Sequence, residues 1–587
     1  MTTVRQILRC ARRIGQIQEG GAKLLNRSVR CASTQARQKI TEDENGKKVF
    51  LSPYGDFTPS DLLVQEYIWK DLANHANKIA LECAVTGRKY TYSETRDASN
   101  YIARSLINMG LRKGDVIALI APNYPETVLA FLGVLEANLV VTTVNPAYTP
   151  DEVKRQIQNS GAKAIITVAE IARSILEATR GTLPPGVPFV VIEDGTGPIP
   201  EATIPFKDLI ARGKSLPPVT SYQTTSQDLA ILPYSSGTTG LPKGVMLTHK
   251  NLVANMEMSE KTAGEKMWQS ATSDFQEIIP VILPFFHIFG MNVVTLPRLA
   301  HGTKLITLPR FIPELFIKLL MKEQVTGMFV VPPILLFFNS SPYVKKELLS
   351  NVHHIISGAA PMSKTDAERF YNKFETDPSK LKITQGYGLT ETSPVVCLEM
   401  DGVKTGSIGK NIAGCELRLV DPATNEDVSG PGQTGEIWVR GPHVMKGYLN
   451  NEAATRETIV ENSWLKTGDI AYFDEEFDFF VTDRLKELIK VKGFQVAPAE
   501  LEALLRTHPD VQEAAVIGIP DERSGEVPKA FILLKKNAKS SAEDIKNFIK
   551  GKVSDYKELQ GGVVFVDNIP KNASGKIVRQ QLKNECK

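Results

Sequence analysis

The stretch Tyr234-Ser235-Ser236-Gly237-Thr238-Thr239-Gly240-Leu241-Pro242-Lys243-Gly244 decides the fold of this chain. Its glycines let the backbone turn tightly and bring successive N–H groups close to an anion. The apolar run Leu229 to Leu232 precedes it and is typical of a short buried strand. The spacing is not that of a Walker loop, which ends in Gly-Lys-Ser/Thr. We therefore predict a phosphate-binding loop at the end of a strand, with a flexible Ser/Gly/Thr linker as the alternative.

The loop offers two kinds of donor to a phosphate group. Its hydroxyls and backbone amides are neutral donors, whereas the ammonium of the lysine is a point charge. The residues that we expect to contact phosphate are Ser235, Ser236, Gly237, Thr238, Thr239, Gly240 and Lys243.

Length and composition indicate a globular protein of more than one domain. The chain has 587 residues, too many for a single core. It is 42% apolar and 23% charged with a net charge of +3, so nothing indicates a nucleic-acid partner. Six scattered cysteines without metal-ligand spacing fit a reducing compartment. No segment reaches the ~18 apolar residues of a transmembrane helix, while peripheral membrane contact and the oligomeric state stay open.

Residues 1–39 differ from the rest of the chain. They hold nine Lys and Arg residues and a single acid, Glu19, with apolar residues at roughly helical spacing. A basic, acid-poor amphipathic helix is typical of a mitochondrial transit peptide, which favours the matrix as the location. A disordered basic tail and a helix on a membrane surface are the alternatives. The C-terminal Asn584-Glu585-Cys586-Lys587 is not a peroxisomal address.

The region from 49 to 219 alternates helical and strand patterns. Such alternation predicts an α/β fold with a largely parallel sheet covered by helices. The helices are expected at 93–109, 125–137 and 151–160, and the strands at 116–121, 140–144 and 164–168. We expect a large α/β domain over 45–482 and a small α+β domain over 483–587.

Four further motifs follow the loop in the large domain. Phe285 to Met291 surrounds His287 with large apolar residues, which by default indicates a core histidine. Gly358 and Ala359 follow a predicted strand and would let the backbone approach a flat ring, although a plain tight turn fits equally. The last two are Gln385-Gly386-Tyr387-Gly388-Leu389-Thr390-Glu391 and Trp464-Leu465-Lys466-Thr467-Gly468-Asp469, each of which is a simple turn in the alternative interpretation.

Two basic motifs lie in the C-terminal region. Thr482 to Gln495 reads Thr-Asp-Arg-Leu-Lys-Glu-Leu-Ile-Lys-Val-Lys-Gly-Phe-Gln, for which a basic solvated helix is the alternative to a functional hinge. Pro570-Lys571-Asn572-Ala573-Ser574-Gly575-Lys576-Ile577 places a lysine on a Ser-Gly loop.

Together these motifs, in this order, resemble the adenylate-forming superfamily, the acyl-CoA synthetases and their relatives. The resemblance covers about residues 50 to 582 and is strongest to the hydroxycinnamate–CoA ligase and firefly-luciferase branch. It implies a large N-terminal domain of layered α/β sheets and a small mobile C-terminal α+β domain.

The resemblance also implies a role for each motif residue. Tyr387 would stack on adenine, Thr390 would meet the phosphates, Glu391 would help to hold Mg²⁺, and His287 would border the carboxylate of the substrate. The pivot between domains would be Lys486, and Lys576 would be the mobile catalytic lysine. The remaining expected nucleotide- and CoA-contacting residues are Gly358, Ala359, Gln385, Gly386, Asp469, Arg484, Lys492 and Gly493, with Lys490 and Gln495 on the thioester-forming face.

The implied activity is an acid–thiol ligase that uses ATP, Mg²⁺ and coenzyme A. ATP would convert a carboxylic acid to an acyl adenylate, and CoA would then displace AMP. Phe289 stands where the hydroxycinnamate enzymes usually have a tyrosine, which favours a medium- to long-chain fatty acid. An aromatic-acid ligase, a luciferase-like oxygenase, a carrier-loading ligase and a non-catalytic lipid- or nucleotide-binding protein are the alternatives.

Overall fold

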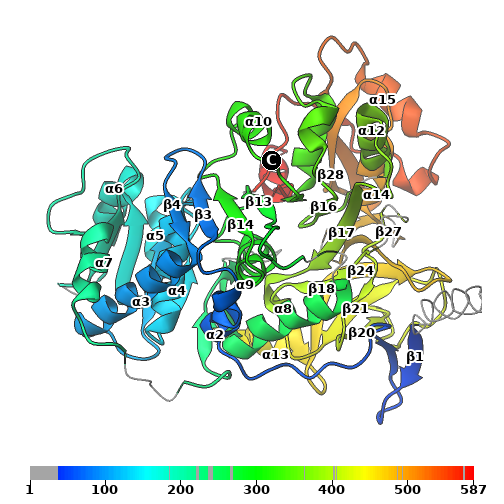
Figure 1. Ribbon diagram of the computed structural model, residues 1–587. Helices are drawn as coiled ribbons and strands as arrows, with labels where there is room; N and C mark the ends of the chain where they lie inside the picture. The colour runs from blue at the N-terminus through cyan, green and yellow to red at the C-terminus, as the bar shows by residue number, and fades with distance from the viewer. Residues whose placement is uncertain are drawn as a thin grey trace, which may run out of the picture.

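The computed structural model describes residues 38–586 except 184–185, 220–223, 236–241, 265–266, 268, 363, 401–403, 405, 486, 492–493 and 573–574 (Figure 1). Most of the predicted transit peptide therefore lies outside the described residues. Its last two residues belong to the fold, because Gln38 Nε2 donates to Asn411 Oδ1 at 2.6 Å and Lys39 begins strand β1. Within the described residues, the strands form five sheets.

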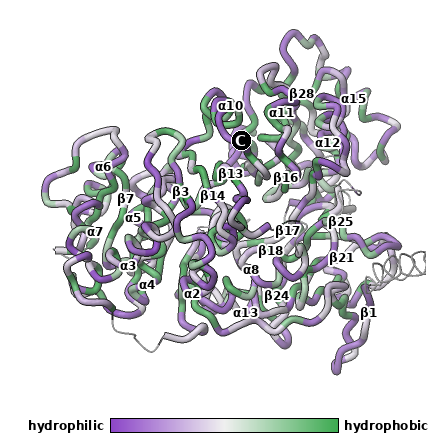
Figure 2. The backbone as a smooth tube through the Cα atoms, in the orientation of Figure 1, coloured by the Kyte–Doolittle hydropathy of each residue, from purple (hydrophilic) through white to green (hydrophobic). Residues whose placement is uncertain are grey.

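The largest sheet confirms the predicted parallel core of the N-terminal region. Its order is β11-β12-β10-β6-β5-β7-β8-β9. Strands β10, β6, β5, β7, β8 and β9 run parallel to one another, whereas β12 is antiparallel to β10. Figure 2 shows hydrophobic segments along these strands and hydrophilic ones on the surrounding helices and loops. The strands are β5 (Val116–Ile120), β6 (Val140–Thr143), β7 (Ala164–Val168), β8 (Phe189–Ile192), β9 (Ile204–Pro205), β10 (Leu229–Ile231), β11 (Tyr234–Ser235), β12 (Lys243–Thr248) and β22 (Gly447–Tyr448).

Helices cover this sheet at the predicted positions. The first begins one residue earlier than expected, because Thr91 rather than Ser93 caps it: the Thr91 hydroxyl accepts from the Glu94 N–H, and Glu94 accepts from the Thr91 N–H. The helices of the N-terminal half are α2 (Val64–Trp69), α3 (Tyr92–Asn108), α4 (Pro125–Glu136), α5 (Pro150–Ser160), α6 (Ala169–Thr179), α7 (Phe206–Lys214) and α8 (His249–Ala263).

Two further sheets build the centre of the molecule. In one of them β15, β16 and β17 run parallel, so their carboxyl ends meet at one edge. Its strands are β15 (Gly327–Val330), β16 (His354–Ser357), β17 (Lys382–Gly388), β18 (Val395–Leu398) and β19 (Lys410–Asn411). The other contains β13 (Ile278–Val281), β14 (Lys304–Thr307), β3 (Ile79–Cys83) and β4 (Lys89–Thr91). The accompanying helices are α9 (Leu296–Ala300), α10 (Pro313–Lys322), α11 (Pro332–Ser340) and α12 (Lys364–Phe374).

A seven-stranded antiparallel sheet was not predicted from the sequence. It joins an N-terminal hairpin to strands more than 360 residues later, with Phe50 opposite Leu417. Its strands are β1 (Lys39–Glu42), β2 (Lys48–Leu51), β20 (Glu416–Val420), β21 (Gly435–Arg440), β23 (Ile459–Val460), β24 (Trp464–Phe473) and β25 (Phe479–Arg484), and α13 (Glu452–Thr458) lies beside it. Because β25 pairs with β24 as far as Arg484, this sheet extends two residues into the segment expected to begin the small domain.

The C-terminal segment forms a small α+β unit with its own apolar core (Figure 1). Its elements are β26 (Ile489–Val491), β27 (Phe494–Val496), α14 (Pro498–Leu505), β28 (Val511–Asp521), β29 (Gly525–Leu534), α15 (Ala542–Ile549), β30 (Val563–Phe565) and α16 (Arg579–Asn584). The basic-helix alternative for 482–495 is therefore wrong, since this segment contains strands. Helix α15 ends at Ile549, two residues before Gly551, which adopts a left-handed conformation (φ +75°). No helix of the described residues is long and apolar enough to span a membrane.

Candidate active site

The two ends of the predicted phosphate loop are joined as a hairpin. Ser235 in β11 lies opposite Lys243 in β12, and the loop itself, 236–241, lies outside the described residues together with Ser236, Gly237, Thr238, Thr239 and Gly240. The Lys243 ammonium is 4.9 Å from the centre of the Tyr448 ring. Strands β11 and β12 therefore fix the base of the loop, and phosphate binding by the loop stays a prediction.

Glu391 is held beside this hairpin by two hydroxyl groups. Its Oε1 accepts from Ser235 Oγ at 2.9 Å and from Tyr448 Oη at 3.0 Å. The carboxylate is 9% exposed and follows Thr390 in a single helical turn after β17. A lone carboxylate next to a phosphate loop fits Mg²⁺, which usually binds one or two carboxylates together with substrate phosphates. The described residues contain no cluster of three or more metal-binding side chains, so phosphate oxygens would complete the coordination.

A second carboxylate, Asp469, lies between an aromatic ring and a guanidinium group. Tyr387 Oη donates to its Oδ2 at 2.7 Å, and Arg484 Nε donates to its Oδ1 at 3.0 Å. Asp469 is 4% exposed, and burial raises the pKa of Tyr387, so its hydroxyl remains a donor at neutral pH. Each carboxylate oxygen can accept a second hydrogen bond, so Asp469 retains the capacity to bind ribose hydroxyls.

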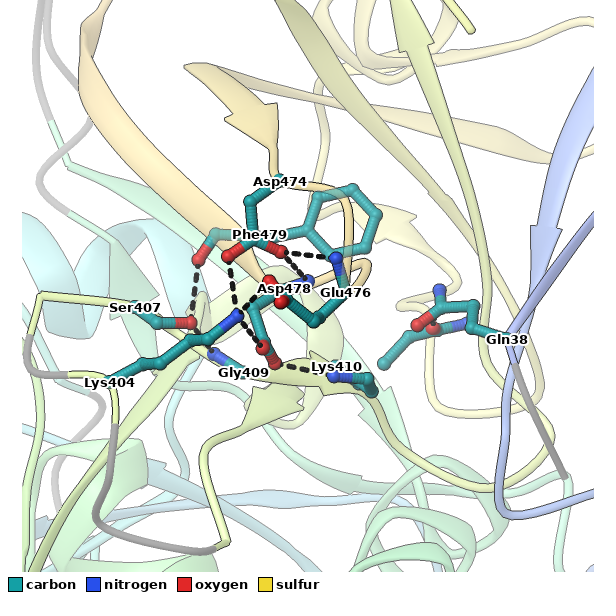
Figure 3. Close-up of polar contacts among 10 residues, drawn as sticks. Gln38, Lys404, Ser407, Gly409, Lys410, Asp474, Glu476, Asp478 and Phe479 are labelled. Carbon is teal, nitrogen blue, oxygen red and sulfur yellow. Dashed lines mark hydrogen bonds and ion pairs between the residues drawn. The ribbon is translucent and has the colours of Figure 1, made fainter. Parts of the chain in front are cut away.

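The hairpin that carries Asp469 and Arg484 is fixed at its turn by a charged cluster (Figure 3). The Lys404 ammonium contacts Asp474 at 2.7 Å and Asp478 at 3.1 Å, and it also pairs with Glu476. Ser407 Oγ donates to the Phe479 carbonyl at 3.1 Å. These contacts tie the turn between β24 and β25 to the segment that follows β18.

Gln385 and Gly358 shape the adjoining edge of the central sheet. The Gln385 side chain accepts from the Met362 N–H at 2.6 Å and donates to the Ser407 carbonyl at 3.1 Å, so its role here is to hold two loops. A Cβ on Gly358 would lie 3.0 Å from two ring carbons of Phe289. Ala359 has a φ of +67°, which is unusual for a residue with a side chain and is typical of functional sites. Gly386 lies between Gln385 and Tyr387 in β17.

His287 is a neutral imidazole at this edge, as expected for a group that borders a carboxylate. Burial lowers its pKa to about 4, and the positive charge of Lys576 contributes. Its Nδ1 accepts from the Phe289 N–H at 3.2 Å, which fixes the ring. Of the apolar residues around His287, Phe286 and Phe289 are partly exposed, whereas Met291 is fully buried in the core.

The small domain delivers Lys576 to the same place. A Cβ on the neighbouring Gly575 would lie 3.3 Å from Pro333 Cγ, so this loop packs on the junction between β15 and α11. Burial lowers the pKa of Lys576, Arg484 lowers it further, and the negative charges of Asp469 and Glu391 oppose both effects.

The residues assigned to the second half-reaction are not at this site. Lys490 is exposed on β26, where its backbone N–H donates to Glu526 at 2.8 Å. Lys486, Lys492 and Gly493 lie outside the described residues, as does the side chain of Gln495. The structure therefore brings together the residues expected to act in adenylation and leaves Lys490 facing solvent.

The segment 441–448, which packs against Glu391, was not predicted from the sequence. Tyr448 was not singled out, because a Gly-Tyr pair in a polar loop carries no distinctive signal. The Asn251 side chain of α8 donates to the Pro442 and Val444 carbonyls at 2.8 and 2.9 Å, and the Met445 N–H donates to the Glu391 carbonyl at 2.8 Å. These bonds hold the segment 441–448 against Glu391.

Comparisons with known proteins agree with this geometry. Residues 68–449 match the family model described as AMP-binding enzyme, and residues 500–576 match the AMP-binding enzyme C-terminal domain. The chain is 39% identical over 561 residues to 4-coumarate–CoA ligase 1 of Arabidopsis thaliana, covering 94% of this chain and 98% of the relative. It is also 39% identical over 542 residues to 4-coumarate–CoA ligase 3 of Oryza sativa subsp. japonica, covering 91% and 94%.

Solved structures show the same architecture. ATP-bound MatB from Rhodopseudomonas palustris has a TM-score of 0.79 at 25% identity, covering 90% of this chain and 99% of that one. The anthranilate CoA ligase AuaEII in complex with anthranoyl-AMP has a TM-score of 0.80 at 26% identity, covering 90% and 98%. The chain therefore belongs to the AMP-binding enzyme family, and it is an acid–thiol ligase with a large N-terminal and a small C-terminal domain.

Proposed function

We propose that this enzyme joins an aromatic carboxylic acid to coenzyme A in two steps. In the first, a carboxylate oxygen attacks the α-phosphorus of ATP, and pyrophosphate leaves as the acyl adenylate forms. In the second, the CoA thiolate attacks the acyl carbon, and AMP leaves as the thioester forms. The observation that carries this proposal is the convergence of Lys576 from the small domain with Glu391 and Asp469 from the large domain.

The side chains divide the first step between binding and charge stabilisation. Asp469 and Tyr387 would hold the nucleoside, while Lys243 and Lys576 would offset negative charge on the phosphates. Glu391 would hold Mg²⁺, which supplies charge neutralisation on the phosphates when bound. His287 is neutral, so it can contact the carboxylate of the substrate without forming a buried ion pair. Holding the substrate and ATP close together in the correct orientation would lower the remaining activation barrier.

The second step requires the small domain to turn. In the described orientation Lys576 occupies the adenylation site and Lys490 is exposed. A rotation about the segment after Arg484 would withdraw Lys576 and bring the face that carries Lys490 toward the adenylate. CoA would then reach the acyl carbon.

The substrate class is supported by the relatives, whose names describe ligases for 4-coumarate and anthranilate. Phe289 adds a restriction, because its ring lies against Gly358 and offers no hydroxyl to a phenol. An aromatic acid with an apolar ring is therefore favoured over one with a 4-hydroxyl group, which would lose a buried hydrogen-bond partner.

The test is a panel of acids assayed for AMP release with ATP, Mg²⁺ and CoA. Cinnamate, 4-coumarate, benzoate, octanoate and palmitate would be compared for wild type and for Phe289→Tyr. We expect kcat/KM to be higher for cinnamate than for 4-coumarate in wild type, and the preference to shift toward 4-coumarate in the variant. Turnover of the fatty acids alone would contradict the aromatic assignment.

A medium- to long-chain fatty acid is the second candidate, and Phe289 is also the observation that favours it. Its partly exposed ring packs edge-on against that of the buried Phe329, whose ring centre is 6.5 Å away, and so presents an apolar surface to an acyl chain. Octanoate and palmitate distinguish this candidate in the same panel. Light emission with luciferin and oxygen would identify a luciferase-like oxygenase.

We also propose that the chain is imported into mitochondria, on the basis of the basic segment 1–39. Fusion of this segment to a fluorescent protein should direct the fusion to mitochondria, and replacement of Arg5, Arg9, Arg12 and Arg13 by glutamine should abolish the import. A diffuse signal from the unmodified fusion would contradict the proposal.

A further inference from the structure

The first helix of the small domain lacks a cap of its own. Helix α14 starts at Pro498, and its N-cap residue is Ala497, whose side chain has no atom that can accept a hydrogen bond. The N–H groups of the first helical turn need acceptors outside the helix. One of them, the Ala499 N–H, donates to Asp483 Oδ2 at 3.2 Å.

Asp483 belongs to the other side of the domain boundary. It lies in β25, opposite Ile470 of β24, and so is part of the seven-stranded sheet of the large domain. Its side chain is 6% exposed, and its Oδ1 accepts from the Arg484 N–H at 2.6 Å. A carboxylate of the large domain therefore caps a helix of the small domain across the hinge.

The charged groups around this bond are carried by the small domain and the hinge. Arg579 of α16 contacts Glu502 of α14 at 2.7 Å and Glu487 of the hinge at 3.0 Å. Glu502 also accepts from the Val516 N–H of β28 at 2.8 Å. Arg579 lowers the pKa of Asp483 and Glu487 raises it, both by electrostatic interaction. A rotation of the small domain would move all these groups away from Asp483 together.

The same orientation places Lys576 at the adenylation site. Arg506, at the end of α14, lies 3.9 Å from Asp366 of α12, and the Gly575 loop packs on Pro333. Of these described contacts, the bond from Ala499 to Asp483 lies at the pivot, where it must break if the segment after Arg484 turns. Its loss would leave the start of α14 without this acceptor.

We propose that Asp483 is a positioning residue for the reaction: by capping α14 across the hinge, it holds the small domain in the orientation that places Lys576 at the adenylation site. The cap is released when the domain turns for the thioester step. This inference rests on the two-step reaction proposed above and adds a residue that controls the balance between its two halves.

The test measures the half-reactions separately in the full-length enzyme. Adenylation is followed by acid-dependent exchange of labelled pyrophosphate into ATP, and thioester formation by conversion of a supplied acyl adenylate with CoA. The acid is cinnamate, or octanoate if the panel selects it. Asp483→Ala should lower the ratio of adenylation to thioester formation about 2- to 30-fold, the range for loss of a helix cap.

Two variants keep the test specific. Asp483→Asn retains an oxygen for the Ala499 N–H, so its ratio should lie closer to wild type than that of Asp483→Ala. Ser541→Ala removes a cap from α15 within the small domain, where Ser541 accepts from the Asp544 N–H at 3.2 Å, and should leave the ratio unchanged. An equal loss of both half-reactions in Asp483→Ala, or the same ratio change in Ser541→Ala, would overturn the proposal.

The pH dependence gives a second readout. Burial raises the pKa of Asp483 to about 7, against the lowering effects of the Arg484 and Ala499 N–H groups and of Arg579, while Glu487 adds to the rise. Because Ala499 and Arg579 move with the small domain, the charge of Asp483 is coupled to the docked orientation, so the ratio should depend more strongly on pH between about 6 and 8 in wild type than in Asp483→Asn. Parallel profiles would contradict the proposal. If wild type shows neither half-reaction, the proposed function itself is wrong.

Discussion

Replacement of Tyr448 by phenylalanine tests whether Glu391 is held in place by its hydroxyl neighbours. The variant keeps the ring beside Lys243 and removes the hydroxyl, which donates to Glu391 Oε1 at 3.0 Å and is also hydrogen-bonded to Thr458. Tyr448 is 8% exposed, and burial together with Glu391 raises its pKa, so wild type donates this hydrogen bond throughout the neutral range. The metal-binding carboxylate would then depend on Ser235 alone for hydroxyl donors among the described residues.

The magnitude follows from the charge of the acceptor. A hydrogen bond to a charged group is worth about 1.5–3 kcal/mol, and 1.4 kcal/mol is a factor of ten. Pyrophosphate exchange at subsaturating Mg²⁺ should therefore fall about 10- to 100-fold in Tyr448→Phe. Thioester formation from a supplied acyl adenylate should change less than about 2-fold, because this step does not use the Mg²⁺–phosphate contacts.

The assay is the Mg²⁺ dependence of acid-dependent pyrophosphate exchange. Tyr472→Phe, in which the ring stacked on Phe480 is kept, is the matched control. The double variant with Ser235→Ala should be non-additive, because both hydroxyls donate to the same oxygen. A Tyr448→Phe enzyme with the Mg²⁺ dependence of wild type, or one that loses both half-reactions equally, would refute the reasoning.

Three further outcomes are expected. Lys576→Ala should abolish adenylate formation but still convert a supplied adenylate to thioester, and equal loss of both half-reactions would count against the assignment. In wild type, the rate of adenylation should decline as the pH rises, at pH values below the ordinary lysine pKa, because the lowered pKa of Lys576 means that its ammonium loses its charge earlier. The pH–rate profiles of both half-reactions check this. Glu277→Gln should lower the free energy of unfolding by about 3–5 kcal/mol in denaturant titrations, because it removes the carboxylate that pairs at 2.9 Å with Arg298, a residue that is 2% exposed. A loss below about 1 kcal/mol would contradict the importance of this pair. Gly358→Val should displace the Phe289 ring and raise KM for cinnamate at least several-fold with KM for ATP little changed, and unchanged steady-state kinetics would be the contrary result.

Local motifs predicted most of the adenylation site, because each of them fixes its own geometry. The strand before the phosphate loop, the turn at Gly358 and the segment from Gln385 to Glu391 depend on a few neighbouring residues. The small C-terminal domain was also correctly expected from one contiguous stretch of sequence, while the role of Lys576 stays a prediction.

Contacts between distant segments could not be predicted in the same way. The seven-stranded sheet pairs Phe50 with Leu417, and no periodicity in either strand specifies its partner. Tyr448 acts on Glu391 only because β22 pairs with β12, which places the two residues together. The cap at α14 likewise depends on a side chain from a different sheet, whereas the sequence around Ala497 gives no sign of it.

The arrangement around Asp469 has a consequence for the order in which products leave. Tyr387 and Arg484 already hold both carboxylate oxygens in the protein alone, so little rotational freedom is lost when a ribose arrives. AMP carries the same ribose as ATP, so its binding should be favoured to the same extent by the fixed position of Asp469. The nucleotide product should therefore dissociate slowly, compete with fresh ATP, and make turnover sensitive to the cellular ratio of the two.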